Sequence, residues 1–210
     1  MIRNVIFIAL SLMVMILSYL IQSFEFILIG FIGLSIIFLV LAGLIHIFSK
    51  VNPKILRIPL FIIGICALGI VASLFRPYDE AILKTGNESE KLEYAYETDQ
   101  KDRMQLKPYI LNDLHERDEI RLKQVRNIYN SAEELEPIDK FHAAFVYHHS
   151  DNSNDYEIAS SLAAAAAKAP HLKDHYQVQW LSKAAYDRWM LSIGKPEKYN
   201  TQNKFSIGVE

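Results

Sequence analysis

The sequence has almost no cysteine: Cys66 is the only one among 210 residues. It lies inside a long apolar run, so the polar second half of the chain can form no internal disulfide and has no thiol for nucleophilic catalysis. The stability of that second half must therefore come from side-chain packing.

Charge is equally scarce in the first third of the chain. Between Val5 and Phe75 the only charged residues are Glu25, Lys50, Lys54 and Arg57. Three apolar runs fill this region, at residues 5–21, 26–48 and 55–75. A helix needs about 20 mostly apolar residues to cross the hydrocarbon core of a bilayer. We therefore expect three transmembrane helices and name the lipid bilayer as a partner.

A cleaved signal peptide is the alternative for the first run. The run has one early arginine, Arg3, no small-residue cleavage site before the "QSFEF" segment, and a second apolar run directly behind it. These features favour a retained span. The interior of the runs lacks acids and arginines, which argues against a transporter or a proton pathway.

Lys and Arg are distributed unevenly around the runs, which predicts the orientation. The amino terminus carries Arg3 and the second connection carries Lys50, Lys54 and Arg57, whereas the first connection has no basic residue. By the positive-inside rule, the amino terminus is cytoplasmic and the carboxyl-terminal domain lies outside the inner membrane of a bacterium. The small pair Gly69 and Ser73 indicates close helix packing, within the chain or in a homo-oligomer.

The second half shows no alternating strand pattern. Its alanine-rich segment, residues 159–169, has high helix propensity and ends at Pro170. We predict an all-α protein: a membrane domain over residues 1–76, a connector over 77–98 and a helical domain over 99–210. Without a sustained basic face or an aromatic platform, nucleic acid is excluded as a partner.

Three histidines and several acids crowd the stretch "FHAAFVYHHSDNSNDYEIA" from Phe141. On a helix from Asp139 to His149, the side chains of Phe141, Phe145 and His148 share the core face. His142 and His149 then lie two turns, about 10 Å, apart, which is too far to share one metal ion. We therefore predict no metal site and no cofactor.

The polar segment that follows the histidines resembles part of a calcium-binding loop. The glycine that such a loop requires is replaced by Tyr156, and the bidentate glutamate by Leu162. The alternative is a helix start, in which Asn154 caps the next helix and Glu157 completes a capping box. We predict a helix–turn–helix junction.

A second informative stretch begins at Trp180. A helix to Ile193 places Asp187 in an apolar stripe, where a carboxylate is costly unless it is paired. The predicted partners are Arg188, Arg103 or a histidine of the earlier helix. Gly194 then ends the helix.

These segments together resemble a widespread bacterial family of unknown function. Its members carry an A-A-x-x-x-Q-H helix, a W-L-x-A-A-x-D-R helix and a final Q-x-[YF]-G-T-Q motif, matched here by "AAFVYHH", "WLSKAAYDR" and "KYNTQ". Two departures from the pattern matter: His148 replaces the glutamine before the histidine, and Asn200 replaces the glycine of the final motif. The polar residues that the resemblance singles out are His149, Asp187, Arg188, Thr201 and Gln202, with Asp99, Gln100 and Arg103 upstream.

Three functions remain open at this stage. The first is a membrane-anchored helical module that binds an unknown ligand or envelope protein. The second is a hydrolase or transferase for a small anionic substrate, in which Asp187 orients His149 as general base. In that hypothesis Arg188 or Arg103 binds the anion, and Gln100, Thr201 and Gln202 complete the pocket. The third is a membrane effector that the helical domain regulates.

Overall fold

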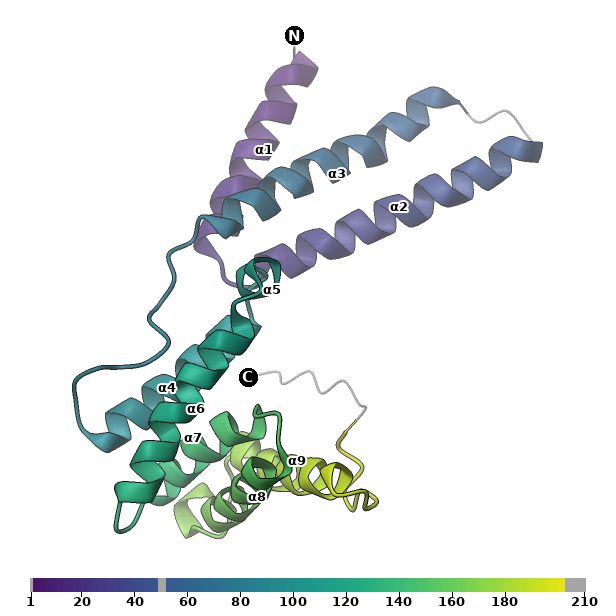
Figure 1. Ribbon diagram of the computed structural model, residues 1–210. Coiled ribbons are helices and arrows are strands. Elements are labelled where there is room, and N and C mark those ends of the chain that lie inside the picture. Colours follow the sequence, from purple (N-terminus) through teal and green to yellow (C-terminus); the bar gives the residue numbers. More distant parts are fainter. Residues whose placement is uncertain (1, 49–51, 203–210) are drawn as a thin grey trace. The chain divides into compact units, whose positions relative to one another are not determined.

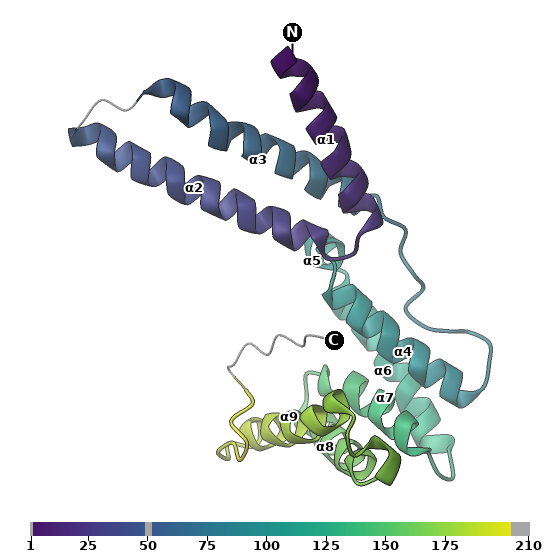
Figure 2. The same cartoon turned by 180° about the vertical axis from the view of Figure 1, so that it is seen from behind.

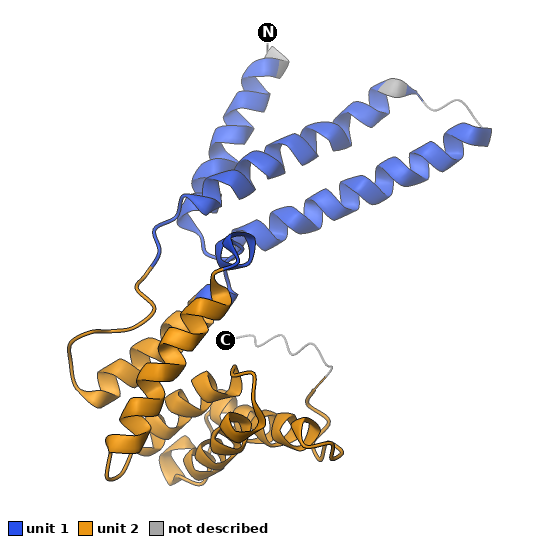
Figure 3. Ribbon diagram, viewed as in Figure 1, with its two compact units in different colours: residues 1–78, 102–112 blue, residues 79–101, 113–210 orange. Residues whose placement is uncertain are grey.

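The computed structural model describes residues 2–48 and 52–202. All regular structure in these two ranges is helical, which confirms the all-α prediction (Figure 1). The chain divides into two compact units (Figure 3). Unit 1 comprises residues 1–78 and 102–112, and unit 2 comprises residues 79–101 and 113–210.

Unit 1 contains the apolar helices. They are α1 (Ile2–Leu20), α2 (Phe24–Phe48) and α3 (Pro53–Leu74). The short α5 (Lys107–Leu111) belongs to the same unit. α3 packs against both α1 and α2, and lies between them in both views (Figure 2). The crossing is close at Gly69, where an added Cβ would lie 2.7 Å from Val14 and 2.6 Å from Leu28. The small residue therefore permits packing within this chain.

Two helices of unit 1 are long and apolar enough to cross a membrane, the ranges being Phe24–Phe48 and Lys54–Leu74. Only 17% and 22% of their most apolar windows is buried inside the protein, unlike the core helix of a water-soluble domain. Over the first run, the part with described side chains is an apolar helix from Asn4 to Leu20. Among the described residues, two helices rather than the predicted three meet the criteria of length and composition for a span.

The ends of these helices meet at a buried ion pair. The Arg76 guanidinium, just beyond α3, lies 3.2 Å from the Glu25 carboxylate at the start of α2. It also donates to the Ile21 carbonyl at 2.9 Å, at the end of α1. Glu25 in turn accepts a hydrogen bond from the backbone N–H of Leu106 at 3.2 Å. The one acid of the apolar region therefore ties α1, α2, α3 and the approach to α5 together.

Unit 2 holds the polar helices. They are α4 (Glu88–Arg103, whose last two residues fall in unit 1), α6 (Leu114–Ser131), α7 (Pro137–His148), α8 (Ser153–Ala167), a 3-10 turn at Pro170–Leu172 and α9 (Tyr176–Ser192). α8 packs against both α7 and α9. Its alanines Ala159, Ala163 and Ala166 have no exposed surface, so their small side chains let the three helices approach closely.

The predicted division at residues 77–98 and 99–210 differs from these units. Residues 88–98 form most of α4 instead of a connector, and residues 102–112 belong with the apolar helices. The reason is that α4 is mostly charged and buries little apolar surface, chiefly Leu92 and Ala95. The sequence of α4 therefore shows no clear helical period of apolar residues from which the helix could be predicted.

Helix ends in unit 2 correct two further predictions. α7 begins at Pro137 with Glu136 as N-cap, two residues before the predicted start at Asp139, which lies inside the helix. α8 is capped by Asn152, whose side chain accepts from the Asp155 N–H at 3.0 Å; the predicted cap, Asn154, lies inside the helix. The cap thus lies two residues earlier than predicted, and the Asn152 side-chain amide also donates to the Asp155 carboxylate at 2.6 Å.

Other local predictions agree with the structure. Phe141, Phe145 and His148 are all buried, as expected for the core face of α7. α9 ends at Ser192, and Gly194 follows with a φ of +72°, the left-handed conformation expected of a helix-terminating glycine.

Candidate functional site

Asp187 on α9 is fully buried, and its partners come from the carboxyl-terminal tail. Its carboxylate accepts hydrogen bonds from the backbone N–H groups of Lys198 at 2.8 Å, Tyr199 at 3.0 Å and Thr201 at 3.0 Å. The Thr201 hydroxyl donates a further bond at 2.8 Å. Burial raises the pKa of Asp187, but the four donors outweigh it and hold the pKa below its usual value. The predicted partners Arg188, Arg103 and histidine are therefore replaced by the tail.

The tail itself is a tight loop closed by two of the predicted residues. The Gln202 side-chain amide donates to the Ala184 carbonyl at 3.0 Å, and its backbone N–H donates to Glu197 at 3.0 Å. Asn200 has a φ of +56°, so asparagine takes the left-handed conformation at the position where the resembling family has glycine. Thr201 and Gln202 thus hold the loop against α9.

Arg188, the neighbour of Asp187, acts on a different segment. Its guanidinium donates to the His148 carbonyl at 2.6 Å and lies over the Tyr156 ring, 5.7 Å from the centroid. The last carbonyls of a helix lack intrahelical partners. Arg188 therefore satisfies the end of α7 and links it to α8 and α9.

His149 pairs with Asp99 of α4 rather than with the predicted Asp187. The His149 Nδ1 atom lies 2.9 Å from the Asp99 carboxylate, which has 1% of its surface exposed. Gln100 donates its amide to the same carboxylate oxygen at 2.8 Å. A carboxylate on Nδ1 fixes the orientation of the imidazole and leaves Nε2 for another partner. Asp99, singled out by the resemblance, does meet His149, and Gln100 binds the same carboxylate oxygen.

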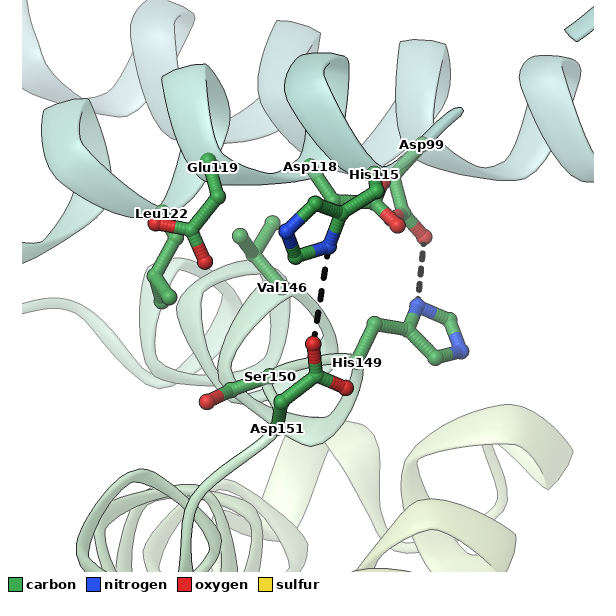
Figure 4. Close-up of a pocket in the computed structure, with 9 residues that line it drawn as sticks. All are labelled: Asp99, His115, Asp118, Glu119, Leu122, Val146, His149, Ser150 and Asp151. Atoms are coloured by element: carbon green, nitrogen blue, oxygen red, sulfur yellow. Dashed lines mark hydrogen bonds and ion pairs between the residues drawn. The ribbon is translucent and has the colours of Figure 1, made fainter. Parts of the chain in front are cut away.

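A small polar cleft lies beside this pair (Figure 4). Two histidines, four acids and three other residues line it: Asp99, His115, Asp118, Glu119, Leu122, Val146, His149, Ser150 and Asp151. Figure 4 shows His115 facing Asp151 across the cleft, at 3.5 Å, while His149 turns to Asp99. The cleft encloses only about 10 Å³, the room of roughly one water molecule. As it stands, the cleft has no room for a molecule larger than water.

The cleft also lacks the arrangement that nucleophilic catalysis or metal binding needs. Ser150, the one hydroxyl in its wall, donates to the Asp155 carboxylate at 2.6 Å. Asp155 is further paired with Arg126 at 3.0 Å. Within residues 2–48 and 52–202, no three His, Cys, Asp or Glu side chains are arranged to hold a metal ion. The polar side chains around His149 are hydrogen-bonded to side chains of other helices, as His149 is to Asp99 of α4 and Ser150 is to Asp155 of α8.

The predicted site residues are thus divided among separate networks. Asp187, Thr201 and Gln202 hold the tail; Arg188 binds the end of α7; His149 and Gln100 converge on Asp99. Arg103 belongs to unit 1, where its backbone carbonyl accepts from the Tyr109 hydroxyl at 3.5 Å. They do not form one catalytic centre.

Comparisons with models of protein families, with curated proteins and with solved structures found no match to this chain. The resemblance noted in the sequence therefore stays a prediction.

Among the buried charges that sequence reasoning missed is Arg121 of α6. It has no exposed surface and donates to Asp118 at 2.8 Å and to the Thr98 hydroxyl at 3.2 Å. The signal was weak, since Arg121 sits among many charged residues. Only its position three residues after Asp118 marked the pair.

Proposed function

We propose that the protein is a membrane-anchored helical binding module of the bacterial cell envelope. Unit 1 holds the chain in the bilayer and unit 2 offers its surface to a ligand or an envelope protein. The observation that carries the anchoring is the exposure of large apolar side chains along α2 and α3, such as Leu34 at 65% and Ile58 at 62%. In water such a surface would cause association, whereas in a bilayer it contacts lipid chains.

The proposal includes α1 as a third membrane-embedded helix. It packs on α3, and its outer face is equally apolar, with Val5 60% and Ile16 57% exposed. Three crossings place unit 2 on the opposite side of the membrane from Lys54 and Arg57, hence outside the cytoplasm by the positive-inside rule. Lys50 of that basic set lies outside the described residues, and Arg3 contributes no described side chain.

Binding is favoured over catalysis because the polar residues are used for packing. The Asp187 carboxylate already has four donors, Arg188 closes a helix end, and the cleft at His149 has room for about one water molecule. Networks of this kind commonly fix the arrangement of helices. A binding surface then lies on exposed residues such as Leu191 and Ile193, which are 44% and 41% exposed at the end of α9.

Two measurements test the anchoring and the topology. Alkaline carbonate should leave the full chain in the membrane pellet; recovery in the supernatant would refute anchoring. In a Cys66→Ala background, Lys183→Cys should react with an impermeant maleimide on intact spheroplasts, and Asn52→Cys only after lysis. The reverse pattern would overturn the orientation.

Photo-crosslinking tests the binding role. A photoreactive amino acid at Leu191 or Ile193 should give a discrete crosslinked product in cells, and the same group at Lys168, an exposed position in another helix end, should not. The absence of any product at both α9 positions would count against this surface.

A hydrolase or transferase is the second candidate, favoured by the pairing of His149 with Asp99. That geometry suits a general base, because the carboxylate holds the imidazole while Nε2 can accept a proton. The full chain in detergent would be screened by thermal shift with phosphate esters, nucleotides, amino acids and divalent metals. A ligand shift that His149→Ala abolishes in a folded protein would favour the enzyme over the binding module.

A further inference from the structure

A groove between α1 and α3 has an apolar wall and a basic end. Toward its apolar end it is lined by residues such as Leu10 of α1 and Ile65 of α3. At the amino-terminal ends of the same two helices it is lined by Asn4, Lys54 and Arg57. Its volume is about 690 Å³, within the range of roughly 300–1,000 Å³ that is usual for small-molecule sites.

The groove follows from how the two helices pack. They approach closely at Gly69, where an added Cβ would lie 2.7 Å from Val14 and 2.9 Å from the Ser18 hydroxyl. Figure 1 shows α1 and α3 separating from this crossing toward their amino-terminal ends. The opening is therefore widest where Lys54 and Arg57 stand.

The neighbouring groove, between α2 and α3, provides a contrast. It has a volume of about 370 Å³, and Ser35 is its one polar lining residue; no charged side chain lines it. Acyl chains alone suit such a surface. The groove between α1 and α3 differs by two cations and an amide, so its occupant needs an anionic group at one end.

The rest of the apolar region leaves those cations without acidic neighbours. In the sequence from Met1 to Phe75 the only acid is Glu25, which opens α2 and pairs with Arg76. Lys54 and Arg57 open α3, near the connection that the positive-inside rule assigns to the cytoplasm. Basic pockets between membrane helices on that side are suited to anionic lipid head groups.

We propose that this groove binds an anionic phospholipid of the inner leaflet. The phosphate lies between Lys54 and Arg57, with the Asn4 amide as an additional donor, and an acyl chain follows the apolar wall past Leu10 toward Ile65. The proposal rests on the proposed membrane anchoring, because the lipid reaches the groove from the bilayer.

The first test counts retained lipids on the full chain. The protein is reconstituted in nanodiscs of equal phosphatidylglycerol and phosphatidylcholine, transferred to a zwitterionic detergent and analysed by native mass spectrometry. We expect retained phosphatidylglycerol in excess over phosphatidylcholine. The variant Lys54→Gln/Arg57→Gln should retain it roughly 30-fold less, since each basic residue contributes about fivefold. The matched control, Lys123→Gln/Lys183→Gln, removes two exposed cations from unit 2 and should behave as wild type.

A second variant separates the acyl chain from the head group. Leu10→Trp fills the apolar part of the groove and keeps both cations, so it should also lose the lipid while α-helical circular dichroism is unchanged. Stabilisation of wild type by soluble glycerol phosphate alone would show a head-group site and overturn the acyl-chain assignment. Equal retention of both lipid classes, or wild-type retention by both variants, would overturn the proposal. A chain that alkaline carbonate removes from membranes would instead refute the anchoring itself.

Discussion

The Asp187 carboxylate accepts hydrogen bonds from both the backbone N–H and the hydroxyl of Thr201, at 3.0 and 2.8 Å. The two residues belong to α9 and to the tail beyond it. Because Asp187 is fully buried, each of these donors offsets part of the cost of removing the carboxylate from water. The contact therefore fixes the tail and stabilises the charge at once.

Removing one donor at this contact should destabilise unit 2 measurably. Thr201→Val loses the hydroxyl, and we expect the free energy of unfolding to fall by about 1–2 kcal/mol. Thr201→Ser keeps the donor and is the control. Both tryptophans, Trp180 and Trp189, lie in α9, so denaturation followed by their fluorescence reports on this unit. Equal stability of the valine and serine variants would contradict the role assigned to the hydroxyl.

His142 should make unit 2 sensitive to mild acid. Burial lowers its pKa to about 4, from 6.5, and its ring stacks on Tyr96 with centroids 5.0 Å apart. Between these two pKa values the unfolded chain binds the proton and the folded chain does not. Stability is therefore complete above pH 6.5 and falls as the pH drops toward 4, by about 2 kcal/mol at pH 5.

The matched variant for this effect is His142→Phe, which keeps an aromatic ring against Tyr96 and cannot take up a proton. The measurement is the free energy of unfolding at pH 7.5 and pH 5 for both proteins. Wild type should lose about 2 kcal/mol more than the variant over this interval. An identical pH dependence would show that His142 is already solvated in the folded protein.

Much of unit 2 could be predicted from local sequence rules. The core face of α7 followed from helical spacing, since Phe141, Phe145 and His148 fall on one stripe, and all three are buried. The end of α9 followed from Gly194, because a helix needs a left-handed residue to terminate in this way. These features depend on neighbours within about four residues.

The partners of the polar residues could not be predicted, because they depend on contacts between distant segments. His149 meets Asp99 fifty residues earlier, and Asp187 meets a tail whose path depends on the left-handed Asn200. The Asn152 cap was missed for a different reason: two asparagines stood close together, and each had an acid three residues later. The sequence alone does not decide between such equivalent caps.

The buried Arg121 of α6 should contribute strongly to stability. Arg121→Met leaves Asp118 without its 2.8 Å partner and the buried Thr98 without two donated bonds. Because Asp118 is 18% exposed and the Thr98 acceptors are buried, we expect a loss of about 1–3 kcal/mol. Lys123→Met, an exposed position of the same helix, should change the free energy of unfolding by less than about 0.5 kcal/mol. A small effect at both positions would mean that the pair only balances its own desolvation.

The alanines of α8 provide the sharpest test of how closely the helices of unit 2 pack. Ala163 has no exposed surface, whereas Ala165, two residues later on the same helix, is exposed. Leucine adds the same atoms and the same helix propensity at either position. Ala163→Leu should lower the free energy of unfolding by about 1–3 kcal/mol, because the added atoms must displace α7 or α9. Ala165→Leu should change it by less than about 0.5 kcal/mol. Tolerance of leucine at both positions would show that α8 can move away from its neighbours, and that the alanine run reflects helix propensity rather than close packing.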